Sequence, residues 1–542
     1  LSRQAVSNLT WIWNPAGPAA GAYYPGPYWV DWIGLNCGSL NGSFDTFYGN
    51  FSADTFQKPV MLLDLALSGP ATATALIGSA KNHKAVRGIL FTGTERLPDP
   101  AVLETLRKQP FSNRAFISSP FGFLKSDAPG RSGCISGERG NFRFTESDFY
   151  IRGIAYNPGH DWRDGNIPLT RRQLEKDFTL IRQMGANTIR RYGSSIYDRN
   201  VLNLAQEHGL KVLFGFFFDP AVDYYRDSAK IEAYISEVES SVKHYRGHPA
   251  VLGWVLGNET WGQLKKKFGK PYLVKVRQHY VKMIELLAQR IHRLDPSHPV
   301  LTGMEHIGHQ LPGELWAFRT GAPSVDIIAI NSYYRQNVSR MEELIAKLDP
   351  SRPYIVSEFG PKGYWEAELN TVSNGLLAEE TETEKSEWYR EQWEEYVLKH
   401  KGSNLGGVAY CWRDRLEGSL TWFGLMDHKG RLKPSYFSLK QCWTGDHTPQ
   451  PAVTRIQHPH EIVPGREYDF TAVSAPESGD LRYEWSLYRN DYLEEINNIR
   501  LQDESSHVKV TIPEAPGRYR LYLHASAPDG KVFTCSVAME VK

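Results

Sequence analysis

Two glutamates each follow a short apolar run and could share acid, base or nucleophilic work. Glu358 stands near the end of P-Y-I-V-S-E-F-G-P, and Glu259 ends V-L-G-W-V-L-G-N-E. Apolar runs of this length, bounded by Gly or Pro, are typical of buried parallel strands. Two carboxyl groups at strand ends are what the cleavage of a glycosidic bond needs. Either glutamate taken alone could instead be a helix N-cap or an ion-pair partner.

The segment around the two glutamates shows a repeated alternation of strand and helix patterns. We expect strands at 149–156, 186–192, 210–218, 251–256, 299–303, 325–331 and 407–412, and one that ends at Glu358. Each is followed by a helical pattern or a long loop, which predicts a (β/α)8 (TIM) barrel of the α/β class over residues 141–445. In such a barrel Glu259 and Glu358 both lie at the C-terminal ends of strands, where this fold keeps its chemistry.

The parts on either side of the barrel have different patterns. Residues 1–110 predict a partial, half-barrel-like βα domain, with strands at 9–13, 29–36, 59–67 and 86–92 and helices at 71–84 and 99–108. Residues 111–140 are rich in Ser, Gly and Pro and predict a linker, and 141–150 predicts a hairpin lid. Residues 453–542 alternate in short runs separated by Pro464-Gly465, Pro516-Gly517 and Asp529-Gly530, which predicts an all-β sandwich of immunoglobulin-like type. A spacer or packing role is the expectation for this sandwich.

Composition narrows the class of partner. The 542 residues carry 62 basic and 61 acidic side chains, a net charge of +1, which favours neither nucleic acid nor an anionic membrane. No apolar run approaches the roughly 18 residues of a membrane span. A carbohydrate is the expected partner. The expected location of the protein is outside the cytoplasm, either extracellular or periplasmic. The oligomeric state stays open. The chain starts at Leu1 without Met or a signal peptide, as in a mature form or an excised fragment.

Neither a metal nor a cofactor is expected to take part in the chemistry. The five cysteines lack C-x-x-C spacing, and His, Cys and Asp do not cluster as catalytic metal ligands do. The acidic run Glu379–Glu395 predicts one solvated helix face.

Six motifs occur in the same order as in the barrel of glycoside hydrolase family 2. They are I-R-G-I-A-Y-N, N-T-I-R-R-Y, H-P-A-V-L-G-W-V-L-G-N-E, D-I-I-A-I-N-S-Y-Y, R-P-Y-I-V-S-E-F-G and F-G-L-M-D-H-K-G-R-L-K-P-S-Y-F. The segment therefore resembles that family, whose retaining enzymes carry both acids at the ends of strands four and seven. The resemblance implies Glu259 as acid/base, Glu358 as nucleophile and Tyr333 as a hydrogen-bond donor to the nucleophile. It also implies Arg190 in the site and Trp412 as the platform under the reacting sugar.

Further side chains at strand ends are expected to bind substrate. Asn258 could donate to the sugar 2-hydroxyl. Glu305, His306 and Trp261 are expected to line neighbouring subsites, and so, less directly, are Asp219 and Arg413–Arg415.

In the N-terminal segment, W-I-W-N-P through K-P-V-M-L-L-D resembles the C-terminal half of a glycoside hydrolase family 26 barrel. Asp64 or Leu65 stands there in place of that family's nucleophilic Glu, so no catalysis is expected from this part.

Three functions follow from these patterns. The first is a retaining β-glycoside hydrolase that works by double displacement on a β-linked glycan. The second is a transglycosylase with the same residues, because N-T-I-R-R-Y-G also resembles β-glucan transferases of the same clan. The third is a non-catalytic glycan-binding or scaffold protein, against which the presence of both Glu259 and Glu358 counts.

Overall fold

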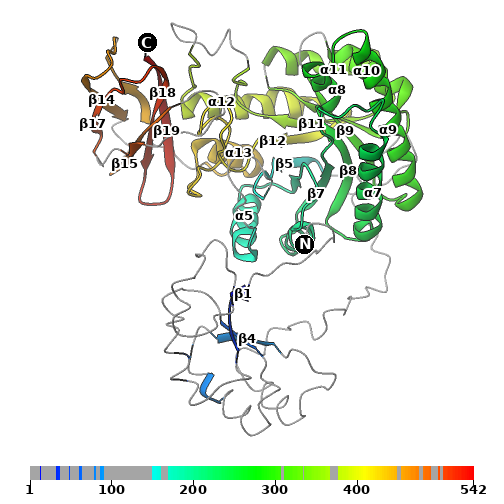
Figure 1. Ribbon diagram of the computed structural model, residues 1–542, viewed down its shortest axis with the longest axis horizontal. Helices are drawn as coiled ribbons and strands as arrows, with labels where there is room; N and C mark the ends of the chain where they lie inside the picture. The colour runs from blue at the N-terminus through cyan, green and yellow to red at the C-terminus, as the bar shows by residue number, and fades with distance from the viewer. Residues whose placement is uncertain are drawn as a thin grey trace. The chain divides into compact units, whose positions relative to one another are not determined.

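The computed structural model shows how these segments fold (Figure 1). It describes residues 149–159, 169–306, 310–333, 335–365, 376–447, 453–459, 461–474, 480–489, 499–500 and 505–541. In the N-terminal part it describes 12–13, 32–36, 45, 48, 60–63, 78–80, 83 and 86–90. The chain divides into two units, residues 1–128 with 167–172, and residues 129–166 with 173–542. The predicted linker, the hairpin lid before Phe149, the helix at 99–108 and Asp64 with Leu65 lie outside the described residues.

A closed barrel of eight parallel strands forms the centre of the second unit, which confirms the predicted fold class. The strands, in order around the barrel, are β10 (Ile327–Asn331), β11 (Tyr354–Phe359), β12 (Asn404–Ala409), β5 (Ile151–Ala155), β6 (Thr188–Arg190), β7 (Lys211–Phe216), β8 (Val251–Asn258) and β9 (Val300–Glu305). Pairing of β12 with β5 closes the ring. The eighth strand begins and ends three residues before the predicted range 407–412.

Helices follow the strands and cover the outside of the barrel, as Figure 1 shows for α7 and α9. They are α5 (Arg171–Gln183), α6 (Asp198–Glu207), α7 (Ser228–Tyr245), α8 (Thr260–Gln263), α9 (Tyr272–Leu294), α10 (Leu311–Gly321), α11 (Arg335–Leu348), α12 (Glu382–Glu391) and α13 (Pro434–Thr444). Shorter helical turns are η4 (Leu264–Lys266), η5 (Gln392–Val397) and η6 (Leu398–His400). Helix α5 buries Leu174, Phe178 and Ile181, one face of its 3.6-residue repeat.

The interior of the barrel is filled by apolar side chains, and polar side chains lie at the C-terminal ends of the strands. Leu252, Val255, Leu301, Ala329 and Ile355 belong to one buried cluster that fills the centre. The packed centre fixes the positions of the strands, and so of the polar side chains at their C-terminal ends. None of the helices that the structure describes has the length and apolar character of a membrane crossing.

The first unit contains a four-stranded parallel sheet in the order β1 (Ile12–Trp13), β2 (Trp32–Asn36), β3 (Val60–Leu63) and β4 (Val86–Leu90). The strands fall within the four predicted ranges. Ile33, Leu35, Val60, Leu62 and Val86 are buried. A short helical stretch at 78–80 lies within the predicted helix 71–84.

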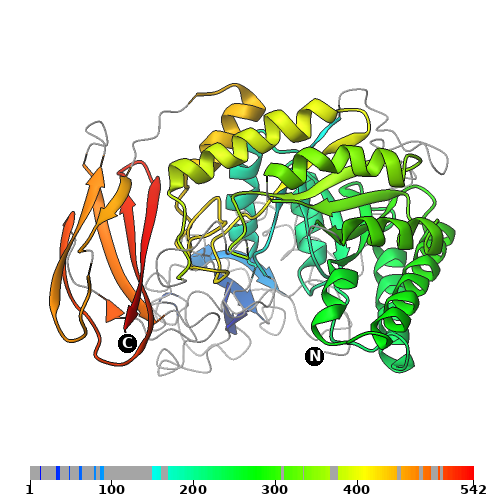
Figure 2. The ribbon, with the colours of Figure 1, turned by 90° about the horizontal axis from the view of Figure 1, so that it is seen from above.

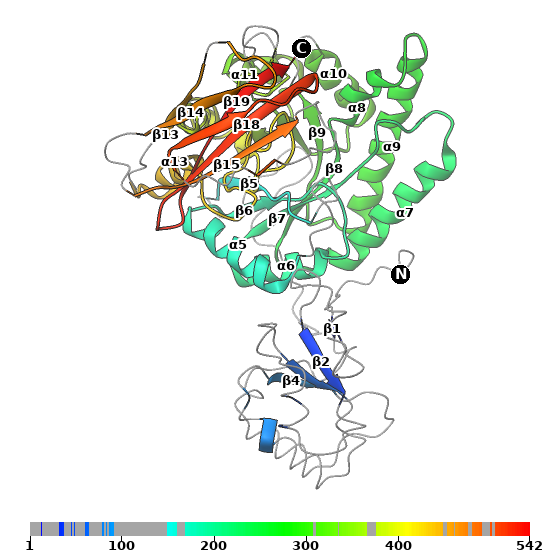
Figure 3. The ribbon, with the colours of Figure 1, turned by 60° about the vertical axis from the view of Figure 1, so that its left-hand side comes forward.

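The C-terminal part is a sandwich of two antiparallel sheets, whose strands run from orange to red in Figures 2 and 3. One sheet has the order β13 (Val453–Gln457), β14 (Glu467–Ser474), β17 (His507–Thr511). The other has the order β16 (Ile499–Arg500), β15 (Arg482–Arg489), β18 (Gly517–Ser526), β19 (Val532–Val541). Phe470, Val508 and Val510 from the first sheet and Trp485 and Leu521 from the second share one core. The predicted all-β architecture is thus present.

A buried group of charges joins this sandwich to the barrel. Glu379 accepts hydrogen bonds from Lys385 (2.6 Å), Thr421 (2.7 Å) and, on the sandwich, Ser536 (2.7 Å). Arg520 of β18 lies 3.8 Å from the Glu379 carboxylate and donates to the carbonyl oxygen of Leu377 at 2.6 Å. Burial alone would raise the pKa of Glu379, but the charges of Lys385 and Arg520 hold that pKa well below its usual range.

The expectation of a solvated acidic face is therefore wrong for two members of the run. The side chains of Glu379 and Glu382 are only 3% and 2% exposed. Lys433 lies 3.0 Å from Glu382 and 3.2 Å from Asp414, so their charges are compensated inside the protein. A charge run in a sequence does not reveal cations that are distant in the chain, such as Lys433 and Arg520, which is why the pattern misled.

Replacing Arg520 with Met should destabilise the whole second unit. Removal of one partner from a buried charged group leaves the other charge poorly compensated, at a cost of about 3–5 kcal/mol. We expect a lower unfolding temperature by calorimetry at pH 7. Lys509→Met is the matched control, because Lys509 is a sandwich cation whose side chain is 62% exposed, and it should change stability little. An Arg520→Met protein as stable as the control would contradict this role for the buried charges.

Candidate active site

Glu358 lies at the end of β11 and is surrounded by hydrogen-bond donors. Arg190, from β6, donates to its Oε1 at 3.0 Å, and Tyr192 donates to the same oxygen at 2.8 Å. The Tyr333 hydroxyl, just after β10, donates to Oε2. Glu358, Arg190, Tyr192 and Tyr333 are all buried. The carboxylate is therefore held in one orientation by three side chains from two other strands.

Burial decides the charge state of Glu358. It raises the pKa of this carboxyl to about 7, and the neighbouring Glu259 adds to the rise. Arg190 and the hydrogen bonds from Tyr333 and Tyr192 act in the opposite direction but do not restore the ordinary value. Loss of hydration thus outweighs the cation and the two hydroxyls.

Glu259 follows β8 in an unusual backbone conformation. Its φ of 56° is left-handed, and it is the one non-glycine residue with positive φ among those the structure describes. The register of β8 against β9 also shifts between Leu256 and Asn258. Such local irregularities re-aim side chains at functional sites. Here they direct both Asn258 and Glu259 to the network around Arg190.

Asn331, the last residue of β10, connects the two glutamates. Its Nδ2 donates to Glu259 Oε1 at 2.8 Å and to Asn258 Oδ1 at 3.0 Å. Its Oδ1 accepts from Arg190 at 3.1 Å and from Ser357 at 2.8 Å. Gln263 donates to the other oxygen of Glu259 at 2.9 Å. The strand ends of β6, β8, β10 and β11 therefore share one hydrogen-bonded network.

The predicted site residues do not all join this network. Arg190, Asn258 and Tyr333 belong to it. Trp412 does not: it is fully buried and packs on Tyr436 with ring centroids 6.3 Å apart. Tyr410 instead packs near the two tyrosines that donate to Glu358, with its ring 6.0 Å from that of Tyr333 and 6.4 Å from that of Tyr192. The structure thus does not support Trp412 as a platform, because β12 ends at Ala409 and strand alternation does not continue to residue 412.

The three expected subsite residues lie on the Glu259 side. Glu305 ends β9, and burial together with the charge of Glu259 raises its pKa to about 7. Burial lowers the pKa of His306 to about 4, and His306 Nδ1 lies 2.9 Å from the Ser332 hydroxyl. The Trp261 ring is buried, and the guanidinium carbon of Arg277 lies 3.6 Å from the centroid of that ring. Of these, only Glu305 shows an electrostatic link to a proposed catalytic group.

Sequence reasoning missed Tyr192, Asn331 and Tyr410. Two of them stand in quoted motifs, Tyr192 in N-T-I-R-R-Y and Asn331 in D-I-I-A-I-N. Alternation along a strand would place Tyr192 on the same side as Arg190, which was a usable signal. Arg191 accordingly points elsewhere, to the carbonyl oxygens of Tyr156 at 3.1 Å and Pro158 at 2.7 Å.

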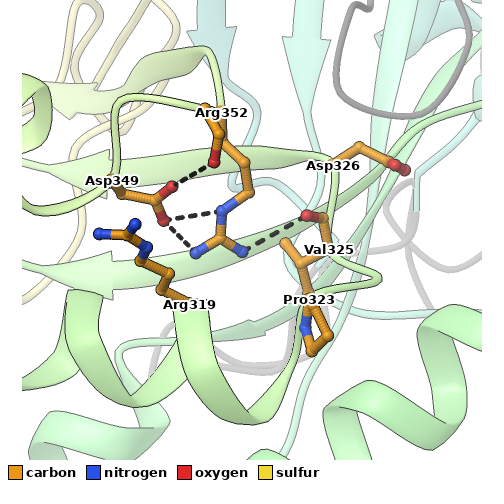
Figure 4. A pocket seen from close by; sticks show the side chains of 7 residues that line it. Arg319, Pro323, Val325, Asp326, Asp349 and Arg352 are labelled. Carbon is orange, nitrogen blue, oxygen red and sulfur yellow. Dashed lines mark hydrogen bonds and ion pairs between the residues drawn. The ribbon is translucent and has the colours of Figure 1, made fainter.

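The barrel also contains a cavity of about 150 Å³. Figure 4 shows side chains that line it. Its walls include Val325 and Asp326, which precede β10, and Asp349 and Arg352, which precede β11. It therefore lies at the N-terminal ends of these strands, opposite the glutamates. The guanidinium of Arg352 is bound to Asp349, and Arg190, Glu259 and Glu358 are not among the residues that line the cavity.

Among the described residues, Asp427, His428 and His524 have the composition of a metal site, with ligand atoms within 4.8 Å of one another. The Asp427 carboxylate already accepts hydrogen bonds from Arg431, at 2.8 Å from the backbone N–H and 2.8 Å from Nε. A cation there would have to compete with that guanidinium. Chemistry without a metal stays a prediction.

The fold and the carboxyl pair define a (β/α)8 barrel of the carbohydrate-active kind. The chain matches the family model described as Glycosyl hydrolases family 2, TIM barrel domain, over residues 138–464. This range is more than half of the 542 residues, so the chain belongs to that family.

Similar proteins share parts of this chain. A beta-glucuronidase of Pongo abelii is 28% identical over 200 residues, which cover 36% of this chain and 26% of that protein. A beta-glucuronidase of Rattus norvegicus is 24% identical over 368 residues, 64% of this chain and 50% of that protein. A 1,3-beta-glucanosyltransferase of Schizosaccharomyces pombe is 26% identical over 187 residues, 31% of this chain and 39% of that protein. The matched part thus spans at most half the length of these relatives.

Among solved structures, a beta-glucuronidase of Bacteroides uniformis has a TM-score of 0.45 and 16% identity. The match covers 75% of this chain and 47% of that chain.

The raised pKa of Glu358 gives a pH prediction. Below about pH 7 the carboxyl is protonated, and a protonated carboxyl is a poor nucleophile. With Glu358 in the nucleophile role that the sequence resemblance implies, kcat/KM should therefore fall as pH drops. Tyr192→Phe removes one donor to the carboxylate, which raises this pKa further and moves the acid limb to higher pH. Tyr483→Phe, in the sandwich, is the control. An acid limb unmoved in Tyr192→Phe, or one centred near pH 4, would contradict the described electrostatics.

Proposed function

We propose that the barrel is a retaining β-glycoside hydrolase that acts on a β-linked oligo- or polysaccharide without a cofactor. The observation that carries this proposal is the single network that joins Glu358 to Glu259 through Arg190, Asn258 and Asn331. Membership of a glycosyl hydrolase family agrees with it.

In the first step Glu358 attacks the anomeric carbon as Glu259 protonates the departing oxygen. The three donors to Glu358 fix the direction of attack, and formation of the ester removes a buried negative charge. Both oxygens of Glu259 accept hydrogen bonds from amides, from Asn331 and from Gln263. Rotation of the Gln263 amide would turn its donor into an acceptor for the proton that Glu259 carries.

In the second step Glu259 takes a proton from water, and that water attacks the glycosyl ester to give net retention. Asn258 uses its Oδ1 to accept from Arg190 at 2.7 Å and from Asn331, which leaves its Nδ2 to donate to the sugar 2-hydroxyl. If another sugar replaces water, the same residues perform transglycosylation. The third outcome, a scaffold that binds glycans without cleaving them, requires that the same side chains bind a glycan but give no turnover.

Substrates that differ in leaving group should separate the two glutamates. Glu358→Gln should lose at least about 10³-fold in kcat on every substrate, because no covalent intermediate forms. Glu259→Gln should lose about 10²–10⁴-fold in kcat/KM on oligosaccharides but far less on 2,4-dinitrophenyl β-glycosides, whose leaving group needs no proton.

The panel contains β-linked oligosaccharides and dinitrophenyl β-glycosides of several sugars, including the glucuronide. Glu239→Gln, on α7, is a matched carboxyl control and should keep activity. Products longer than the input would assign transglycosylation. Binding without turnover by the native protein would leave the scaffold function.

We further propose finer assignments for the flanking parts. The sandwich is of immunoglobulin-like type, and the N-terminal sheet is a non-catalytic remnant similar to glycoside hydrolase family 26. The partner is a carbohydrate and not nucleic acid, and the protein works outside the cytoplasm. The boundaries at 110, 140, 445 and 453 are part of this proposal.

A further inference from the structure

An exposed tryptophan lies next to the tyrosine that holds Glu358. The ring of Trp365, in the loop after β11, stands edge-to-face against the Tyr333 ring with centroids 5.1 Å apart and an interplanar angle of 86°. Tyr333 reaches Glu358 with its hydroxyl. Trp365 is therefore one aromatic ring further from the reacting centre than Tyr333.

Trp365 differs from its aromatic neighbours in exposure. Among the residues that the structure describes, the other rings that contact Tyr333 are those of Tyr410 and Phe423, which are 7% and 2% exposed, whereas Trp365 is 42% exposed. Large apolar rings are normally buried, so an exposed one beside a polar site points to an apolar surface of a ligand.

The loop holds this ring in a fixed place. Phe423 stacks on Trp365 with centroids 5.9 Å apart and an angle of 29°, and Tyr364 contacts it edge-to-face at 5.1 Å. A Cβ on Gly363 would lie only 2.1 Å from the Trp365 ring, so glycine is needed for the backbone to pass this close. A ring that is packed on several sides loses little freedom when a ligand covers the rest.

We propose that Trp365 is the stacking platform for a second pyranose ring, the neighbour of the sugar that reacts at Glu358. The proposal rests on the glycosidase function above. The C–H face of a β-linked sugar is apolar and suits an aromatic ring, and its hydroxyls remain in water at the rim. The Trp365 ring contacts the Tyr333 ring, and Tyr333 contacts Glu358. A sugar stacked on Trp365 would therefore lie beside the sugar that reacts at Glu358. Trp365 would thus favour oligosaccharides over single-sugar glycosides.

The experiment compares two kinds of substrate in the full chain. One is the best β-linked oligosaccharide of the panel, and the other is the β-glycosyl fluoride of its terminal sugar, whose one-atom leaving group leaves the neighbouring subsite empty. Trp365→Ala should lower kcat/KM about tenfold on the oligosaccharide, mainly through KM, and less than about twofold on the glycosyl fluoride. Trp365→Phe should recover most of the loss. Trp316→Ala is the control, since Trp316 lies on α10 and is 65% exposed.

Other results would overturn the platform. Equal losses on both substrates would mean that Trp365 only supports Tyr333, and no loss would mean that no sugar contacts it. If the native protein cleaves nothing, the proposed function fails by itself. The platform is then judged by titration of the native protein with β-1,3- and β-1,4-linked glucan hexaoses, followed by tryptophan fluorescence. A response equal in native protein and Trp365→Ala, or no response, would overturn it.

Discussion

The buried guanidinium of Arg190 is the constraint on which the rest of the site depends. A charge with 1% exposure is very costly unless it is paired and hydrogen-bonded. Arg190 meets this requirement through Glu358, Asn258, Asn331 and the carbonyl oxygen of Ser357, at 2.7–3.1 Å. Its partners come from β8, β10 and β11. The bonds that compensate the cation therefore hold Glu358 directly, and they hold Asn331, which in turn donates to Glu259.

The barrel makes room for this cation at a particular point. A Cβ on Gly303 of β9 would lie 3.2 Å from Arg190 Nη2 and 2.9 Å from the carbonyl oxygen of Gly257. Glycine thus permits the close approach of β9 to the end of β8. Burial of the site is unfavourable for the ionised form of Glu358, whose pKa rises from 4.5 to about 7. Such a shift corresponds to about 3 kcal/mol, which opposes folding at pH values above about 7 and declines as the pH falls toward 4.5.

The sequence was enough for the barrel because each strand carries its own signal. Apolar runs such as Val251–Leu256 end at polar residues, and parallel connections leave few topologies. The pair Glu259 and Glu358 followed from the same signal. Tyr410 and Trp412 could not be separated, because that choice depends on where β12 stops, and strand boundaries are poorly encoded. Asn331 and the buried Glu379 were also beyond reach. The groups that contact Asn331, such as Arg190 and Glu259, and most of those that contact Glu379, such as Thr421 and Arg520, are distant in sequence.

The central claim is that Glu358 becomes covalently attached to the substrate sugar. A 2-deoxy-2-fluoro β-glycoside with a good leaving group tests it directly, because fluorine destabilises the oxocarbenium-like transition state and lets the ester accumulate. Mass spectrometry after peptic digestion should find the added sugar on the peptide that contains Glu358 in the native protein. It should be absent from Glu358→Gln. A label on Glu259, or a label that persists in Glu358→Gln, would contradict the account.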